Sequence, residues 1–104
     1  MNTDQKIRHI ANHYGFESQS RQLMEECGEL TQAVNKAWRA WNGIKDPLRP
    51  LKFEEAKNNL VEEIADVSIM IKQLQTLLGI SDGRVTDQIV IKLDREIERI
   101  QNGA

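Results

Sequence analysis

Two segments of the sequence carry the same residue pattern, and this internal repeat constrains the fold more strongly than any other feature. Residues 23–30 and residues 60–67 both read aliphatic, aliphatic, Glu, Glu, apolar, small, acidic, aliphatic. Each segment belongs to a longer apolar row. The first row is Leu23, Cys27, Leu30, Val34, Ala37 and Trp41, and the second is Leu60, Ile64, Val67, Ile71, Leu74 and Leu78. The alternating spacing of four and three residues predicts two long amphipathic helices that pair along these rows.

Capping and breaking residues define four predicted helices. They cover residues 4–14, 18 or 20 to about 41, 53–78 and, after a short turn at residues 81–83, a last segment to about 100. Thr3 is the expected N-cap of the first helix, and Gly15 ends it. Residues 42–52 contain Gly43, Pro47 and Pro50 and are predicted to form a loop, since proline stops a helix.

These elements predict an all-α antiparallel four-helix bundle, with the two long helices at its centre and essentially no sheet. The apolar residues of the last helix are expected to face inward: Val85, Ile89, Leu93, Ile97 and Ile100. With 104 residues, the chain is expected to be a single domain over residues 1–104. Four helices leave part of the long apolar rows uncovered, which favours a homodimer or a dimer of dimers with the site near the interface.

Composition excludes several classes of protein. The formal net charge of −2 gives no reason to expect a nucleic-acid or membrane surface. The single cysteine, Cys27, cannot form an internal disulfide, and its place in an apolar row predicts a buried thiol. Residues 1–9 are polar and do not resemble a signal peptide, and no apolar run approaches a membrane span. The expected location is cytoplasmic.

Four carboxylates lie beside the apolar rows. Glu26 and Glu29 are three residues apart on one helix, and Glu63 and Asp66 occupy the same phase on the other. If the two helices pack antiparallel, both acidic pairs meet near the middle of the bundle. Like charges at this distance repel, and partial burial raises the cost. A hard divalent cation with oxygen ligands removes the repulsion, so the four residues are predicted to hold a metal.

The same residues resemble a known family, the all-α nucleotide pyrophosphohydrolases of the MazG-like superfamily, which includes dimeric dUTPases and dCTP pyrophosphatases. The family pattern of E-E-x-x-E on one helix and E-x-x-D on the next is matched by residues 25–29 and 63–66. Leu30 and Ala33 after the first motif, and residues 59–67 around the second, add to the likeness. The similarity extends over about residues 22–100.

The resemblance implies Mg²⁺-dependent hydrolysis of a nucleoside triphosphate between its α and β phosphates, with Mn²⁺ as an alternative metal. Carried over by position, the metal ligands are Glu26, Glu29, Glu63 and Asp66. A carboxylate that is free of the metal could take the proton of the attacking water, and Glu25 or Glu62 are the candidates. The family often places a Lys and an Arg on the last helix near phosphate, which Lys92 and Arg95 match loosely. An Asn that commonly precedes this Lys is replaced here by Val90.

Aromatic and basic residues surround the predicted loop. Trp38, Trp41 and Phe53 could stack on a base, with Trp38 the candidate, or pack in the core or at a subunit interface. The basic residues of this region could hold a triphosphate or be solvated, and the sequence does not separate these readings: Lys36, Arg39, Lys45, Arg49, Lys52 and Lys57.

Three other functions compete with the leading one. The apolar rows alone would suit a non-catalytic helical oligomerisation protein with acidic faces at its surface. A di-iron bundle requires Glu-x-x-His motifs, and neither acidic motif contains a His. His9 and His13 have a zinc-compatible i,i+4 spacing but no third ligand nearby in the sequence, so surface or packing roles are favoured for both. A hydrolase for another phosphorylated small molecule lies closest to the leading interpretation.

Overall fold

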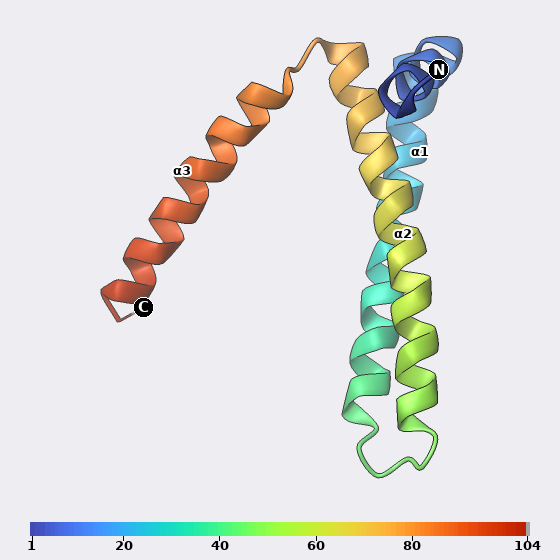
Figure 1. Ribbon diagram of the computed structural model, residues 1–104, viewed down its shortest axis with the longest axis vertical. Helices are drawn as coiled ribbons and strands as arrows, with labels where there is room; N and C mark the ends of the chain where they lie inside the picture. Colours follow the sequence, from blue (N-terminus) through green and yellow to red (C-terminus); the bar gives the residue numbers. More distant parts are fainter. Residues whose placement is uncertain (104) are drawn as a thin grey trace.

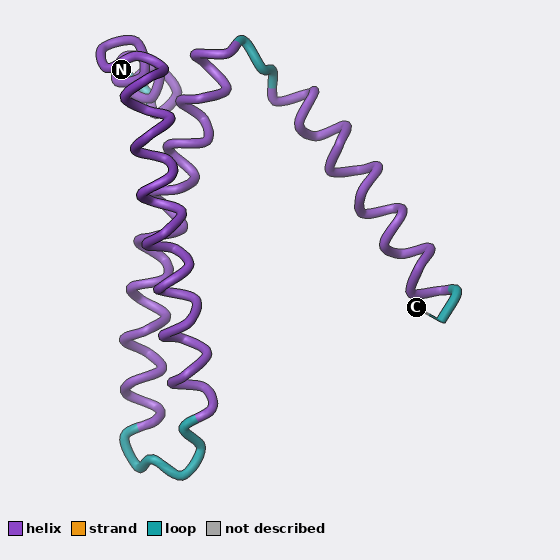
Figure 2. The backbone as a smooth tube through the Cα atoms, turned by 180° about the vertical axis from the view of Figure 1, so that it is seen from behind, coloured by secondary structure: helices purple, strands orange, loops and turns teal. Residues whose placement is uncertain are grey.

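The computed structural model describes residues 1–103, and every regular element within them is helical (Figures 1 and 2). Helix α1 covers Thr3–Asn42, α2 covers Arg49–Leu78 and α3 covers Asp82–Gln101. None of these helices is long and apolar enough to cross a membrane. The predicted all-α class is therefore confirmed for the described part of the chain.

Helices α1 and α2 form a long antiparallel hairpin, and α3 leaves it at an angle (Figure 1). Within residues 1–103, α3 makes no packing contact comparable to that between α1 and α2. One chain therefore does not form the predicted four-helix bundle by itself. The structure has three helices instead of the predicted four, because the first two predicted helices form the single helix α1. The sequence pattern also did not determine which apolar faces pack within one chain.

The N-terminal part of α1 changes direction at Gly15. This glycine has φ 85° and ψ 170°, a backbone conformation outside the helical region, so the predicted helix end is a break inside α1. The helix begins with a capping box in which Asn2 and Gln5 exchange hydrogen bonds of 2.8 Å, so the N-cap is Asn2 and the prediction of Thr3 was wrong. The break lets Ile7 and Arg8 lie against the end of α2, beside Thr76.

We expect Gly15→Ala to lower the free energy of unfolding by about 1–3 kcal/mol, because only glycine adopts this φ/ψ region without strain. Chemical denaturation followed by circular dichroism measures the change. Gly83→Ala is the matched control, since Gly83 lies in the first turn of α3, where an added Cβ makes only an ordinary contact with Ser81. Equal stability of the two variants would contradict the role assigned to Gly15.

The loop between α1 and α2 is shorter than predicted. Helix α2 begins at Arg49, four residues before the expected start, and Pro50 occupies its first turn. Proline is tolerated there because the backbone N–H that it lacks has no partner within the helix. Gly79 ends α2 in the left-handed conformation, with φ 67°, and Ser81 caps α3 by accepting a hydrogen bond from the backbone of Arg84.

The packing divides each apolar row into two columns. Leu23, Leu30 and Ala37 of the first row, and Leu60, Val67 and Leu74 of the second, are buried or half-buried between the helices. The alternate members are exposed: Cys27, Val34, Trp41, Ile64, Ile71 and Leu78. The predicted burial of Cys27 was therefore wrong for the single chain. We call these six residues the exposed columns.

Helix α3 has no buried residue among those described, although it is strongly amphipathic. Its apolar stripe was predicted to face inward, yet Leu93 and Ile100 are each 60% exposed and the other members are also largely uncovered. The stripe and the exposed columns are thus apolar surfaces without a partner in one chain.

A buried hydrogen bond fixes the register of the hairpin. The Gln19 side-chain amide donates to the Gln73 carbonyl oxygen over 2.6 Å, and the two residues are 6% and 2% exposed. Two amides in an apolar interface satisfy each other only when they lie opposite, and leaving one without its partner costs about 1–3 kcal/mol. The pair therefore selects one alignment of α1 with α2.

An exposed ion pair joins α3 to α2. The Asp82 carboxylate accepts hydrogen bonds from Lys72 Nζ at 2.8 Å and from Gln75 Nε2 at 3.0 Å. The hydrogen bond from Lys72 is the main cause that lowers the pKa of Asp82 below its ordinary value of 3.8, and the same bond raises the pKa of Lys72 above 10.5. The pair thus stabilises the fold while Asp82 is ionised and Lys72 is protonated.

We expect the stability difference between the wild type and Asp82→Asn to be constant between about pH 5 and 9. Because the pKa of Asp82 is lowered in the folded state, the difference should shrink as the pH falls below 3.8 and the carboxylate takes up its proton. Urea denaturation at several pH values measures it. Asp87→Asn, on the same helix, is the control, and a difference that persists at the lowest pH would contradict the assignment.

Candidate metal centre

The register of the hairpin brings the two acidic motifs to the same level. Gln19 lies opposite Gln73, so the residue seven positions along α1, Glu26, lies opposite the residue seven positions back along α2, Asp66. By the same count, Glu29 lies opposite Glu63. Seven residues are close to two helical turns, so Glu26 and Asp66 originate near the face that carries the glutamine pair. Glu29 and Glu63 are ten residues from the glutamines and originate about 80° around their helices from that face.

Three of the four carboxylates meet directly. Glu26, Glu29 and Glu63 each offer a carboxylate oxygen, and these oxygens lie within 4.8 Å of one another. Glu26 and Glu63 are half-buried in the contact between the helices, whereas Glu29 is exposed. The expectation that these carboxylates flank the packed row was therefore imprecise, because Glu26 and Glu63 lie within the helix contact itself.

Two carboxylate oxygens in this cluster are buried without a hydrogen-bond partner: Oε2 of Glu26 and Oε2 of Glu63. The other oxygen of Glu26 accepts a hydrogen bond of 3.0 Å from Gln22, one turn earlier on α1. A buried charged oxygen without a donor is costly, because it has lost water and gained nothing in return. The two free oxygens are suited to coordinate a hard cation.

The electrostatics of the cluster also favour a bound cation. The negative charge of Glu26, and then that of Glu63, raises the pKa of the Glu29 carboxyl above its ordinary value of 4.5. Ionised Glu29 is thus disfavoured by its neighbours in the metal-free protein. A divalent cation would reverse this effect by replacing repulsion between the carboxylates with attraction to the ion.

The fourth predicted ligand, Asp66, is exposed and does not join the three-membered group. Its side chain is one methylene shorter than that of Glu, so it reaches less far from α2. The candidate bases Glu25 and Glu62 are also exposed. Each directly precedes a member of the cluster and therefore originates about 100° around its helix from that residue.

The structure does not bring the predicted substrate-binding residues to the carboxylates within one chain. Lys92 and Arg95 lie on α3, which extends away from the hairpin (Figure 1). Trp38 is 63% exposed and lies nine residues after Glu29, which places it about half a turn around α1. Trp41 and Phe53 pack against each other instead, with ring centroids 5.4 Å apart and ring planes tilted by 54°.

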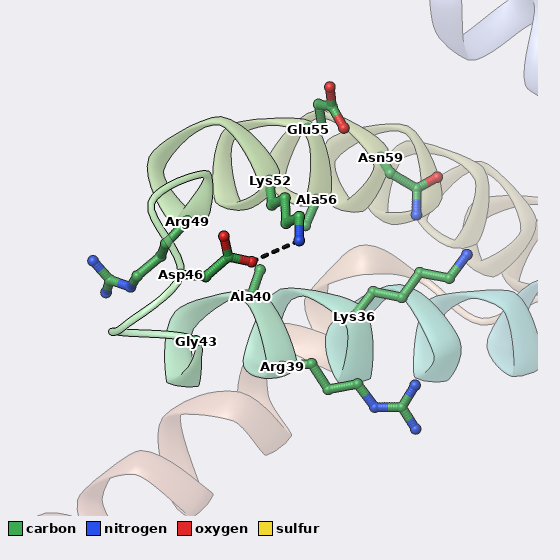
Figure 3. Close-up of a pocket in the computed structure, with 10 residues that line it drawn as sticks. All are labelled: Lys36, Arg39, Ala40, Gly43, Asp46, Arg49, Lys52, Glu55, Ala56 and Asn59. Atoms are coloured by element: carbon green, nitrogen blue, oxygen red, sulfur yellow. Dashed lines mark hydrogen bonds and ion pairs between the residues drawn. The ribbon is translucent and has the colours of Figure 1, made fainter.

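Two features of the site were missed or left undecided by the sequence. Gln22 holds Glu26 from one turn away, and the i,i+4 spacing is the signal that could have identified it. Four of the six basic residues near the loop border a cavity of about 500 Å³ between α1 and α2 (Figure 3), and Lys45 and Lys57 do not. Neither His9 nor His13 belongs to a group of metal-ligating side chains in the described part of the chain.

Comparison with known proteins identifies one family. The model of the MazG nucleotide pyrophosphohydrolase domain matches residues 15–99 and thus includes both acidic motifs and most of α3. No curated protein and no solved structure gave a significant match.

Proposed function

The chain belongs to the MazG nucleotide pyrophosphohydrolase family, and we propose that it hydrolyses nucleoside triphosphates, ribo- or deoxyribo-, to a nucleoside monophosphate and pyrophosphate at the carboxylate cluster. The observation that carries this proposal is the meeting of Glu26, Glu29 and Glu63, with one buried and unpartnered oxygen on each of Glu26 and Glu63. A nucleotide hydrolase must hold polyphosphate close to protein carboxylates, and this arrangement requires a cation between them.

In the proposed site, Glu26, Glu29, Glu63 and Asp66 hold Mg²⁺, or Mn²⁺ in its place. Asp66 is included because it lies opposite Glu26, at the level of the cluster. A change of its side-chain rotamer, without any shift of the backbone, would turn its carboxylate toward the ion. When bound, the ion supplies charge compensation for the phosphates and a more acidic water. Gln22 keeps one oxygen of Glu26 fixed, which leaves the other free for the ion.

Glu25 or Glu62 takes the proton of the attacking water. Both are exposed and adjoin a ligand, so either can remain free of the metal and accept a proton from solvent-side water. Attack at the α-phosphorus breaks the bond to the bridging oxygen, and pyrophosphate leaves. The transition state requires positioning and charge compensation more than covalent help.

The active form is proposed to be a homodimer or a dimer of dimers. The exposed columns of the hairpin and the apolar stripe of α3 are surfaces of the kind that a second copy covers. Two hairpins packed through their exposed columns form a four-helix bundle. In such an assembly, α3 packs against the neighbouring hairpin and brings Lys92 and Arg95 to the phosphates held there. Trp38 of one copy stacks on the base held by the other.

A panel of ribonucleoside, deoxyribonucleoside and modified triphosphates with Mg²⁺ or Mn²⁺ tests the proposal. We expect at least one substrate to yield equal amounts of monophosphate and pyrophosphate, and a chelator to stop the reaction. Release of orthophosphate alone would show that the enzyme cleaves a different anhydride bond and would contradict the proposed reaction. If no triphosphate were hydrolysed while the protein still formed stable oligomers, the exposed apolar surfaces would favour a helical oligomerisation protein instead.

A further inference from the structure

A cavity between α1 and α2 lies near the carboxylate cluster and carries the opposite charge. It has a volume of about 500 Å³, within the usual range for small-molecule sites. We call it the basic hollow, and its lining residues are drawn in Figure 3. Four of them are basic and two are acidic: Lys36, Arg39, Arg49, Lys52, Asp46 and Glu55.

The basic hollow lies on the same side of the hairpin as the cluster. Lys36 follows Glu29 by seven residues, which is about two turns of α1, and Asn59 precedes Glu63 by four residues, about one turn of α2. The hollow thus begins one turn from the carboxylates and continues toward the loop. In Figure 3 the side chains of Lys36 and Arg39 both extend along α1 toward its earlier residues, the direction of Glu29.

Two of the four cations have neither an ion pair nor a side-chain hydrogen bond within residues 1–103, whereas Lys52 and Arg49 are engaged. Lys52 is neutralised by Asp46, with Nζ and the carboxylate oxygen 2.6 Å apart. Arg49 donates to the backbone carbonyl of Trp41 over 2.9 Å. In contrast, Lys36 and Arg39 form no ion pair within residues 1–103, although they are one turn apart and repel each other. An anion between them would remove this repulsion.

The lining favours phosphate over a nucleobase. No aromatic side chain borders the basic hollow within the described residues. The nearby rings are already in contact with other groups, because the Arg49 guanidinium lies 4.7 Å from the centroid of the Trp41 ring and Lys57 Nζ lies 5.2 Å from that of Phe53. A base would find no ring to stack on there, whereas phosphate would find two free cations and the amide of Asn59.

We infer that the basic hollow binds the distal phosphates of the substrate, with Lys36 and Arg39 as their principal contacts. This inference rests on the proposed function for the identity of the substrate. It gives the nucleotide a direction on the hairpin: the β and γ phosphates point toward the loop, and the nucleoside points away from it. The hollow therefore favours triphosphates over nucleotides with shorter phosphate chains.

Calorimetric titration with inorganic pyrophosphate in the absence of metal tests the site without any turnover. In the variant that combines Lys36→Gln with Arg39→Gln, we expect the dissociation constant to rise at least tenfold. Lys45→Gln is the control, since Lys45 is an exposed lysine of the loop after α1 and does not line the hollow. The dissociation constant of this variant should stay within twofold of the wild-type value. Equal affinities in the three proteins, or no saturable binding to the wild type, would overturn the inference.

Kinetics separate the substrate's own phosphates from a free anion. In the double variant, the KM for the triphosphate should rise and inhibition by pyrophosphate should weaken, while inhibition by the monophosphate product stays unchanged. Weaker inhibition by the monophosphate, with pyrophosphate unaffected, would assign the hollow to the nucleoside and overturn the inference. Loss of pyrophosphate binding with an unchanged KM would also overturn it, because the hollow would then hold only a free anion.

The inference and the proposed function fail in different ways. If the wild type hydrolyses triphosphates but pyrophosphate affinity does not depend on Lys36 and Arg39, only the inference is lost. If pyrophosphate binds through these residues but no nucleotide is hydrolysed, the function is lost and the hollow remains an anion site. Circular dichroism of each variant verifies that the helices are intact.

Discussion

Replacing Glu63 with glutamine should reduce metal-dependent release of pyrophosphate by at least about 100-fold, since a neutral amide cannot compensate the charge of the cation. The same change should leave the metal-free protein as stable as the wild type or more stable. Glu63 carries a buried oxygen without a partner and adds to the repulsion that raises the pKa of Glu29. A loss of activity together with a gain of stability is typical of a functional site rather than of a structural one.

Initial rates and thermal melting of the purified protein measure both effects. Glu54→Gln is the control, because Glu54 is an exposed glutamate of α2 whose ion pair with Lys57 contributes little. Glu26→Gln and Asp66→Asn should lose activity in the same way as Glu63→Gln. Activity within a few-fold of the wild type in all three variants would exclude the carboxylates from the reaction.

Replacing Leu93 with glutamate should weaken self-association by about 30-fold or more, the effect of a central interface residue that contributes about 2 kcal/mol or more. Leu93 lies in the middle of the apolar stripe of α3 and is 60% exposed in the single chain. If that stripe covers the hairpin of a second copy, a charge at its centre is buried without a partner. Activity should fall as well, since Lys92 and Arg95 would no longer reach the neighbouring site.

Sedimentation at several protein concentrations measures this effect. Gln88→Glu adds the same charge on the opposite, polar side of α3 and should leave association unchanged. A wild-type protein that sediments as a well-folded monomer, or a Leu93→Glu variant that associates as strongly as the wild type, would rule out the proposed assembly.

The pattern of the sequence identified the helical segments and three carboxylates that lie together out of the four that it predicted. The spacing of four and three residues, with glycines at positions 15 and 79, located the helices to within a few residues at most ends. The repeated motif placed Glu26, Glu29 and Glu63 together because identical phases on paired antiparallel helices bring equivalent residues to one face. Asp66 remains a predicted ligand, at the level of the cluster but outside the three residues that meet.

The pattern did not determine which apolar residues pack within the chain. Leu23 and Cys27 are equally suited to a helix interface, and the inter-helix contact uses the first and exposes the second. The choice depends on the rotation of each helix about its axis. The buried pair of Gln19 and Gln73 takes part in setting this rotation, and hydropathy would place both residues at the surface. For the same reason, the sequence could not show whether the four-helix arrangement forms within one chain or between two chains.

The basic character of the loop region was also visible in the sequence, but the sequence did not show which of these residues are free to bind an anion. A list of lysines and arginines does not tell which of them has an acidic partner. The structure makes this distinction, because Lys52 is paired with Asp46 and Lys36 is not paired within the described residues. The side chains of Lys36 and Arg39 also extend along α1 toward the carboxylate cluster (Figure 3).

The central claim is that Glu26, Glu29 and Glu63 form a cation site, and titration of Mg²⁺ against the melting temperature tests it most directly. The wild type should be stabilised progressively, by about 2.7 kcal/mol when Mg²⁺ reaches 100 times its dissociation constant. The variant that combines Glu26→Gln with Glu63→Gln should melt at least as high as the wild type without metal and should not respond to Mg²⁺. A wild type indifferent to Mg²⁺, or a variant stabilised to the same extent, would contradict the account.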